Sequence, residues 1–285
     1  MNNNDLVSVI VITYNSSKTV LDALESIKRQ TYLNIELIIS DDCSKDDTVK
    51  ICEAWLLNNK QRFNNTEIVT TKCNSGTSGN CNRGCKAAHG RWIKIIAGDD
   101  EFLDDGIEKL VNASQRFPEA KIICAKIECF GVEKVGYDHI TWQHNLKLYD
   151  IVDNVEEQYW YLSNRNFIAA MGLMYERALW EEVGGYDEEV PLLEDWPMWL
   201  KLTGAGYKIF FINEIVARYR LTLTSVRSNN NYRYSVLLFK YRYLYKKENK
   251  FRILKRMQFL KKKNCMTNFI YKILTYAQTR YLHTW

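Results

Sequence analysis

The first third of the chain alternates between short apolar runs, rich in β-branched residues, and longer stretches with helical spacing. Val7 to Thr13 reads VSVIVIT, a continuous apolar run typical of a strand buried on both faces of a parallel sheet. The next stretch, SSKTVLDALESIKRQT, places apolar residues at helical spacing and offers Ser16 or Ser17 as its N-cap. The same alternation predicts further strands at 35–40, 67–71 and 92–97, a helix capped by Asp46 or Asp47, and a short helix through Ala87. Strand–helix repetition of this kind predicts an α/β fold with a mostly parallel central sheet flanked by helices.

The middle of the chain mixes both patterns. KIICAKIECF and AAMGLMY are predicted as strands, ERALWEEVGG and LLEDWPMWLKLTGAG as helices, and KIFFI and VARYRL as two final strands. A shift in composition near Ser225 marks the predicted boundary of this α/β body.

Polar residues stand where three of the predicted strands end. They are Thr13, Tyr14 and Asn15 after the first strand, Asp41 and Asp42 after the second, and Gly98, Asp99 and Asp100 after the strand that starts at Trp92. Ligands of open α/β sheets bind at the carboxyl ends of the strands. We therefore expect these side chains to gather on one rim of the sheet.

Three sets of carboxylates are candidates for chemistry. Asp99 and Asp100 suit a Mg²⁺ or Mn²⁺ ion that grips a diphosphate, although aspartates are also common in solvated turns. Asp41 and Asp42 suit contacts to a base or a ribose, or else the capping of the next helix. Asp195 follows Glu194 in the first turn of a helix, where it suits a general base for an acceptor hydroxyl, or else an ordinary acidic first turn.

Charge divides the chain into two parts. Residues 227–285 hold 15 Lys and Arg against one acid, Glu248, a net charge of +14 that leaves −9 for the preceding 226 residues of a chain whose total is +5. Aromatic residues interleave with the basic ones, a pattern that suits nucleic acid, an anionic membrane surface, or a helix packed on the body. No apolar run there reaches the roughly 20 residues of a bilayer-spanning helix. The eight scattered cysteines and the lack of a secretory signal favour a reducing cytosol with free thiols.

Five segments together carry a resemblance to a known family. In chain order they are VSVIVITYN, ELIISDDCSKDDT, GTSGNCNRGCKAAHGRWIKIIAGDD, EEVGGYDEEVPLLEDWPMWLKL and ARYRLTLTS. This order resembles the inverting glycosyltransferases of family 2, which have the GT-A fold, over residues 5–226.

The resemblance implies roles for the residues at the matching positions. It implies donor contacts from Thr13, Tyr14, Asn15, Asp41, Asp42, Asn82 and Asp99, a Mn²⁺ or Mg²⁺ ion held by Asp100 with Asp99, and Asp195 as the catalytic base. The implied reaction is a single in-line displacement with inversion at the anomeric carbon.

The chain departs from the family pattern at three places. The family usually has Asp-x-Asp-Asp where this chain has Ala97-Gly98-Asp99-Asp100, so alanine occupies one position that is usually acidic. Cys81 stands where an arginine often precedes the asparagine, which would leave that donor contact to Lys72, Arg83 or Lys94. No histidine occurs at Leu221 or Leu223, which would leave phosphate contact to Arg218 or Arg220.

These observations predict a transferase that moves a sugar, by default from a UDP-sugar, to a saccharide acceptor that is lipid-linked, in cell-surface polysaccharide synthesis. We expect a donor-binding half at 1–110, an acceptor-binding half at 111–226, and a basic helical extension at 227–285 that holds the protein on the inner face of the membrane. The alternatives are a nucleic-acid-binding protein that acts through the basic segment, which the acidic body disfavours, and a nucleotidyltransferase, which lacks its glycine-rich basic loop after the first strand.

Overall fold

The computed structural model describes residues 5–131, 154–164, 166–221 and 230–240. Its strands are β1 (Val7–Thr13), β2 (Ile35–Asp41), β3 (Thr66–Thr70), β4 (Trp92–Ala97), β5 (Glu101–Phe102), β6 (Ile122–Gly131), β7 (Leu173–Glu176) and β8 (Phe210–Leu221). Its helices are α1 (Val20–Lys28), α2 (Thr48–Asn59), α3 (Gly76–Ala87), α4 (Gly106–Arg116), α6 (Val155–Asn164), α7 (Arg177–Glu182), α8 (Asp195–Gly204) and α9 (Asn230–Phe239), with 3₁₀ turns η1 (Lys60–Arg62) and η2 (Ala170–Gly172).

The described strands form one sheet in the order β3-β2-β1-β4-β7-β6-β8-β5. From β3 to β4 all neighbours run parallel, as the continuous apolar runs of β1 and β2 predict. In the second half, β6 and β8 run parallel, whereas β7 runs antiparallel to β4 and β6, and β5 runs antiparallel to β8. The parallel half therefore comes from the first hundred residues, and the sheet as a whole is mixed.

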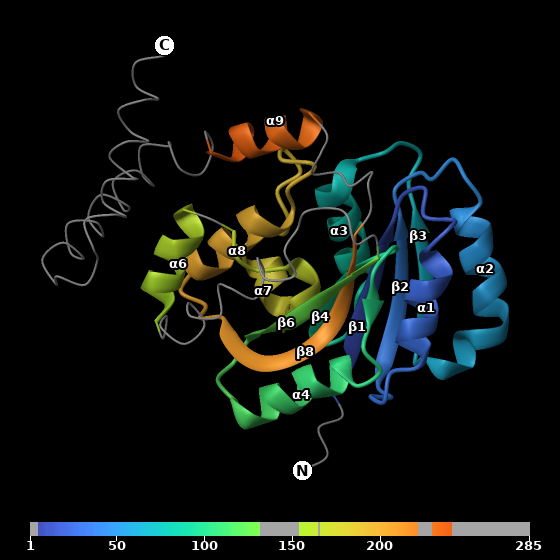
Figure 1. Cartoon of the computed structure of the whole chain (residues 1–285), viewed down its shortest axis with the longest axis horizontal. Coiled ribbons are helices and arrows are strands. Elements are labelled where there is room, and N and C mark those ends of the chain that lie inside the picture. Colours follow the sequence, from blue (N-terminus) through green and yellow to red (C-terminus); the bar gives the residue numbers. More distant parts are fainter. Residues whose placement is uncertain (1–4, 132–153, 165, 222–229, 241–285) are drawn as a thin grey trace, which may run out of the picture. The chain divides into compact units, whose positions relative to one another are not determined.

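Helices cover both faces of this sheet (Figure 1). α1, α2 and α4 share one hydrophobic core with alternate side chains of the strands, among them Val9 and Leu37. α3 packs on the opposite face, where a Cβ added to Gly84 would lie 2.3 Å from Cγ2 of Ile10. Because position 84 carries no side chain, α3 comes close to β1 and β2, and its first turn reaches the ends of these strands.

Several local predictions are confirmed and others are wrong. β1 and β4 have the predicted bounds, whereas KIFFI and VARYRL form the single strand β8, and AAMGLMY opens with η2 before β7 begins. Neither Ser16 nor Ser17 caps α1, whose N-cap is Thr19. The backbone N–H groups of both serines instead donate to side chains at the start of α2, so these residues belong to the loop. α4 was not predicted.

The chain divides into two compact units, residues 1–237 and 238–285, and the sheet belongs to the first. Of the predicted helical extension at 227–285, residues 230–239 form α9, and residues 227–229 and 241–285 lie outside the described part. Within the described ranges, no helix is both long enough and apolar enough to cross a membrane.

Candidate active site at the carboxyl ends of β1, β2 and β4

The carboxyl ends of three neighbouring strands meet at one rim, as the sequence predicts. In the parallel registers, Thr13 of β1 stands beside Asp41 of β2, and Ile12 stands beside Ala97 of β4. The backbone N–H groups of Asp42 and Gly98 donate to the carbonyl oxygens of Thr13 and Ile12. Segments 13–15, 41–42 and 98–100 are thus fixed side by side.

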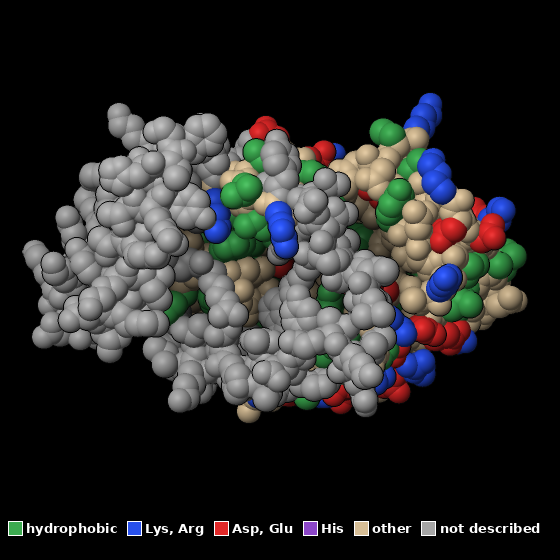
Figure 2. Space-filling view, turned by 45° about the horizontal axis from the view of Figure 1, so that its top comes forward, with side chains coloured by type: hydrophobic (Ala, Val, Ile, Leu, Met, Phe, Trp, Pro, Cys, Tyr) green, Lys and Arg blue, Asp and Glu red, His purple; other side chains and the backbone are tan. Residues whose placement is uncertain are grey.

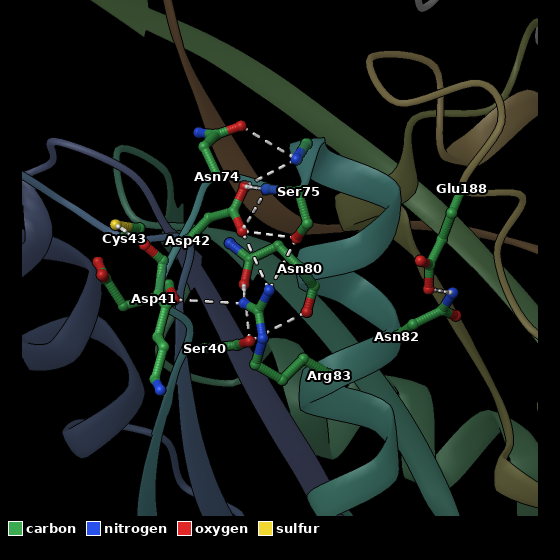
Figure 3. Close-up of polar contacts among 12 residues, drawn as sticks. Ser40, Asp41, Asp42, Cys43, Asn74, Ser75, Asn80, Asn82, Arg83 and Glu188 are labelled. Carbon is green, nitrogen blue, oxygen red and sulfur yellow. Dashed lines mark hydrogen bonds and ion pairs between the residues drawn. The ribbon is translucent and has the colours of Figure 1, made fainter.

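Asp42 joins this rim to the start of α3 (Figure 3). Its buried carboxylate accepts hydrogen bonds from the backbone N–H of Ser75 (3.0 Å) and of Gly76 (2.8 Å) and from the Ser75 hydroxyl (2.7 Å). The Arg83 guanidinium pairs with the same carboxylate at 3.1 Å. An anion at the first N–H groups of a helix is favoured by the helix dipole, so Asp42 sets where α3 begins.

Asp41 and its neighbours bind two loops together. The Asp41 carboxylate accepts hydrogen bonds from the Thr13 hydroxyl (2.9 Å) and from the backbone N–H of Ser44 (2.8 Å). Asn15, whose φ of 54° lies in the left-handed region, donates its N–H to the Ser44 hydroxyl and accepts from the N–H of Lys45. The loop after β1 therefore interlocks with the loop after β2, and half of the Tyr14 side chain stays exposed above them.

Asp99 and Asp100 lie at the end of β4 in a setting that disfavours their charge. Burial, followed by the neighbouring Asp99, raises the pKa of Asp100 well above its usual range. Burial likewise raises the pKa of Asp99. The Asp100 carboxylate accepts the backbone N–H of Arg220 at 2.8 Å, and the Arg220 Nε donates to the carbonyl oxygen of Asp99 at 2.7 Å. Arg220 therefore ties the end of β8 to this acidic pair.

The pair fits a divalent cation by its chemistry. Two adjacent carboxylates with raised pKa values are stabilised when a cation lies between them. Among the described residues, no three His, Cys, Asp or Glu side chains gather as a metal cluster. Mg²⁺ and Mn²⁺ sites at diphosphates ordinarily take one or two carboxylates and complete their shell with phosphate oxygens and water. Asp99 and Asp100 are thus a sufficient protein contribution to such a site.

Asp195 is the first residue of α8. Its Oδ1 accepts the backbone N–H of Trp196 at 2.6 Å, and its Oδ2 accepts the amide of Asn166 at 2.7 Å. The segment before it is fastened to α3, since the Ser78 hydroxyl donates to the Val190 carbonyl at 2.9 Å. Burial, followed by the charges of Glu194, Cys85, Asp195 and Asp42, raises the pKa of Cys81 on α3. The first turn of α3 is thus held both by Asp42 and, through Ser78, by the segment that leads into Asp195.

The structure gives other roles to several predicted contacts. The amide of Asn82 donates to the Tyr186 carbonyl and the Glu188 carboxylate, and it accepts from Trp180 and the Tyr186 N–H. Four bonds fill the hydrogen-bonding capacity of an asparagine amide, so in this structure Asn82 ties α3 to the segment before α8.

Three of the five candidate cations, Arg83, Lys94 and Arg220, have protein partners. Arg83 holds Asp42, and Lys94 is fully buried with its Nζ donating to the carbonyl oxygens of Met171 and Leu173. Arg220 pairs with Asp22 at 2.7 Å and with Glu101 at 2.9 Å. In this structure the two arginines therefore hold acidic side chains, and Lys94 fills the core. Ser75 and Asn166 were not predicted from the sequence, because the local pattern around each residue does not indicate its hydrogen-bond partner.

Residues 8–184 match the family described as Glycosyl transferase family 2. The chain belongs to this family. Among curated relatives, it is 27% identical over 228 residues to the glycosyltransferase GlyG of Streptococcus pneumoniae, covering 76% of this chain and 71% of GlyG. It is 26% identical over 229 residues to WfaP of Escherichia coli, a UDP-Glc:α-D-GlcNAc-diphosphoundecaprenol β-1,3-glucosyltransferase, covering 79% and 81% of the two chains. Several other relatives are longer, and this family member spans less than two thirds of their length.

Solved structures confirm the fold expected from the resemblance. Staphylococcus aureus TarS 1–349 in complex with UDP-GlcNAc superposes with a TM-score of 0.65 at 18% identity, over 87% of this chain and 69% of that one. The mannosyltransferase PcManGT of Pyrobaculum calidifontis, in complex with GDP-Man and Mn²⁺, gives 0.62 at 15% identity, over 99% and 82%. At these identities the similarity establishes the fold alone, which is a mixed α/β GT-A fold. The chemistry of the site depends on this chain's own residues.

Proposed function

We propose that the chain is an inverting glycosyltransferase that moves a sugar from a nucleoside-diphosphate sugar, a UDP-sugar by default, to a saccharide acceptor. One observation carries this proposal. The carboxyl ends of β1, β2 and β4, with the Asp99–Asp100 pair, meet at one rim, and α3, which begins at this rim, is bonded to the segment that leads into Asp195. The nucleotide-sugars bound by TarS and PcManGT support the donor class.

The donor site in this proposal is lined by the rim residues Thr13, Tyr14, Asn15, Asp41, Asp42 and Asp99. Asp41 and Asp42 act mainly by keeping neighbouring protein groups in place, because their carboxylates accept several hydrogen bonds from those groups. They fix the loop after β1 and the start of α3 as two walls. A base lying between these walls meets the exposed Tyr14 ring.

Asp100 and Asp99 would hold a Mn²⁺ or Mg²⁺ ion, whose chemistry is to neutralise the charge that develops on the leaving diphosphate. Asp195 acts as the general base and takes the proton of the acceptor hydroxyl. The acceptor oxygen attacks the anomeric carbon on the face opposite to the diphosphate, which departs with the bonding electrons, and the configuration inverts. General-base assistance of this kind is worth about 10²–10⁴ in rate.

A donor panel with site variants tests this function. We expect one nucleotide-sugar among UDP-, GDP- and dTDP-sugars, supplied with Mn²⁺ and a polyprenyl-diphosphate-linked saccharide, to be consumed with transfer. Asp100→Ala should weaken donor binding, whereas Asp195→Asn should keep donor binding and transfer sugar about 10²–10⁴ times more slowly. Glu119→Gln, at an exposed position, is the matched control and should match wild type. Full transfer by Asp195→Asn would remove that residue from the mechanism.

A lipid-linked acceptor in surface polysaccharide synthesis is the second part of the proposal. It is supported by the net +14 of residues 227–285 and by the lipid-linked acceptor in the name of WfaP. In this proposal residues 1–110 bind the donor, 111–226 bind the acceptor, and 227–285 hold the protein at the inner face of the membrane. Sedimentation with phosphatidylglycerol vesicles should fall when Lys261, Lys262 and Lys263 are changed to Glu. Unchanged sedimentation of that variant would contradict the membrane role.

The two alternative functions lose support. A nucleotidyltransferase does not agree with membership of the glycosyltransferase family. The nucleic-acid alternative acts through residues 227–285, and the preceding residues, with a net charge of −9, would repel a phosphate backbone; on the described part of the face in Figure 2, acidic side chains lie among the basic ones. A salt-titrated gel shift with the full chain checks the second point, and we expect no binding at physiological ionic strength.

A further inference from the structure

Asn166 lies between α6 and η2, about thirty positions before Asp195 in the chain, yet its side chain contacts that residue directly. The amide Nδ2 donates to Oδ2 of Asp195 at 2.7 Å. The other end of the same amide, Oδ1, accepts the backbone N–H of Ile168 at 3.1 Å. Because Ile168 presents a donor, the oxygen of the amide must face it and the NH₂ must face the carboxylate. The orientation of Asn166 is therefore fixed by its own loop.

The second donor to Asp195 comes from its own helix. The backbone N–H of Trp196 donates to Oδ1 at 2.6 Å, so Trp196 and Asn166, which belong to different elements, donate to different oxygens of the carboxylate. A carboxylate torsion is otherwise broad, and two donors on opposite oxygens define the plane of the group. An ionised carboxylate offers about four acceptor positions, and these two bonds take two of them.

We propose that Asn166 is the positioning residue of the catalytic base: its amide holds the Asp195 carboxylate in the plane in which one oxygen meets the acceptor hydroxyl. This inference rests on the proposed function of Asp195. A base that is oriented by a third group is a common arrangement in catalytic sites. The amide suits this role because it is a donor that carries no charge. It directs the carboxylate without competing with the acceptor for the proton.

Two variants separate positioning from packing. Asn166→Asp keeps the volume of the side chain and an oxygen for the Ile168 N–H, but it offers Asp195 a second carboxylate in place of a donor. Asn166→Ala removes the volume and the donor together. A packing role predicts that Asn166→Asp resembles wild type and that Asn166→Ala is impaired. A positioning role predicts that Asn166→Asp is the worse of the two.

We expect kcat for sugar transfer to fall about 10-fold in Asn166→Ala and about 100-fold in Asn166→Asp, which is the scale of a misplaced catalytic group. The KM for the nucleotide-sugar should stay within about twofold, since the Asn166 amide bonds to Asp195 and to the Ile168 N–H and not to the rim that binds the donor. The matched control is Asn112→Asp, which adds the same charge at an exposed position of α4 and should leave both constants unchanged.

The outcomes distinguish this inference from the proposed function. If wild type transfers sugar and Asp195→Asn loses transfer while Asn166→Asp keeps full kcat, the positioning role is refuted and the function stands. If wild type transfers no sugar from any donor in the panel, the function itself fails. In an Asp195→Asn background, Asn166→Asp should change the residual rate less than about twofold, because the group it positions is already gone. A further loss of 100-fold there would also overturn the inference.

Discussion

Lys94 lies within β4 with its ammonium group inside the protein, and replacing it with methionine should alter how stability depends on pH. The side chain is fully buried, and Nζ lies 5.1 Å from the centre of the Phe102 ring and 3.2 Å from the Leu173 carbonyl oxygen. Burial lowers its pKa to about 7, and only the nearby Cys124 acts in the other direction. Among the described residues no carboxylate pairs with this ammonium, so the charged form is costly in the folded state.

The size of the effect follows from the shift. The unfolded chain keeps the Lys94 proton up to its ordinary pKa of 10.5, whereas the folded protein releases it near 7. Between these values the unfolded state binds more protons, so the free energy of unfolding rises with pH. At about 1.4 kcal/mol per pH unit, the whole window is worth about 5 kcal/mol, and the change from pH 7, where the folded-state lysine is half protonated, to pH 9 is about 2 kcal/mol. Below pH 7 both states are protonated and the cost of burial is constant.

Urea unfolding followed by tryptophan fluorescence at pH 6, 7, 8 and 9 measures this directly. The free energy of unfolding of Lys94→Met minus that of wild type should fall by about 3 kcal/mol between pH 6 and pH 9. The carbonyl oxygens of Met171 and Leu173 lose a donor in the variant, which adds a constant penalty. The prediction therefore concerns how the difference in free energy of unfolding changes with pH, and not its absolute value. Burial raises the pKa of Cys124 to about 12, so this thiol stays protonated throughout the range.

Lys86→Met is the control for this experiment, because it removes the same charge from an exposed lysine on α3. A difference between Lys94→Met and wild type that is constant from pH 6 to 9 would refute the reasoning. A slope equal to that of Lys86→Met would refute it as well.

Three further outcomes concern Asp42 of the rim and the helices α2 and α3 beside it. Gly84→Ala should lower the free energy of unfolding by about 1–3 kcal/mol in the same urea assay, since the new Cβ would lie 2.3 Å from Cγ2 of Ile10. Asp42→Asn should lower it by about 2 kcal/mol, because part of the charge-assisted capping of α3 is lost, and an unchanged urea midpoint would contradict this. Partial burial acts to raise the pKa of Asp46, but hydrogen bonds from Thr48 and Ser17 outweigh it and lower this pKa to about 2. Its carboxylate therefore stabilises the fold above pH 4, and this contribution is lost as the pH falls toward 2. At this exposed site solvent screening reduces it to about 1 kcal/mol at most, and acid unfolding of Asp46→Asn should begin from a correspondingly lower stability.

Local patterns predicted the parts of the fold that depend on short-range physics. β1 and β4 have the expected bounds, because a strand buried on both faces must be a continuous apolar run. Parallel pairing of these strands then brought Thr13, Asp41 and the residues after Ala97 to one rim. Two strands were predicted where β8 is continuous, because Asn213 and Glu214 interrupt the apolar pattern without ending the strand.

By itself, the sequence determined the strand–helix alternation, the family resemblance and the carboxylates that meet at the rim. Only the tertiary structure decided what each polar side chain bonds to: that Asn82 is a tether, that Asp42 holds the start of α3, that Arg220 holds Asp100, and that Asn166 holds Asp195. The physical reason is distance along the chain. These partners are separated by 29 to 120 residues, and a hydrogen bond between them leaves no trace in the periodicity of either segment.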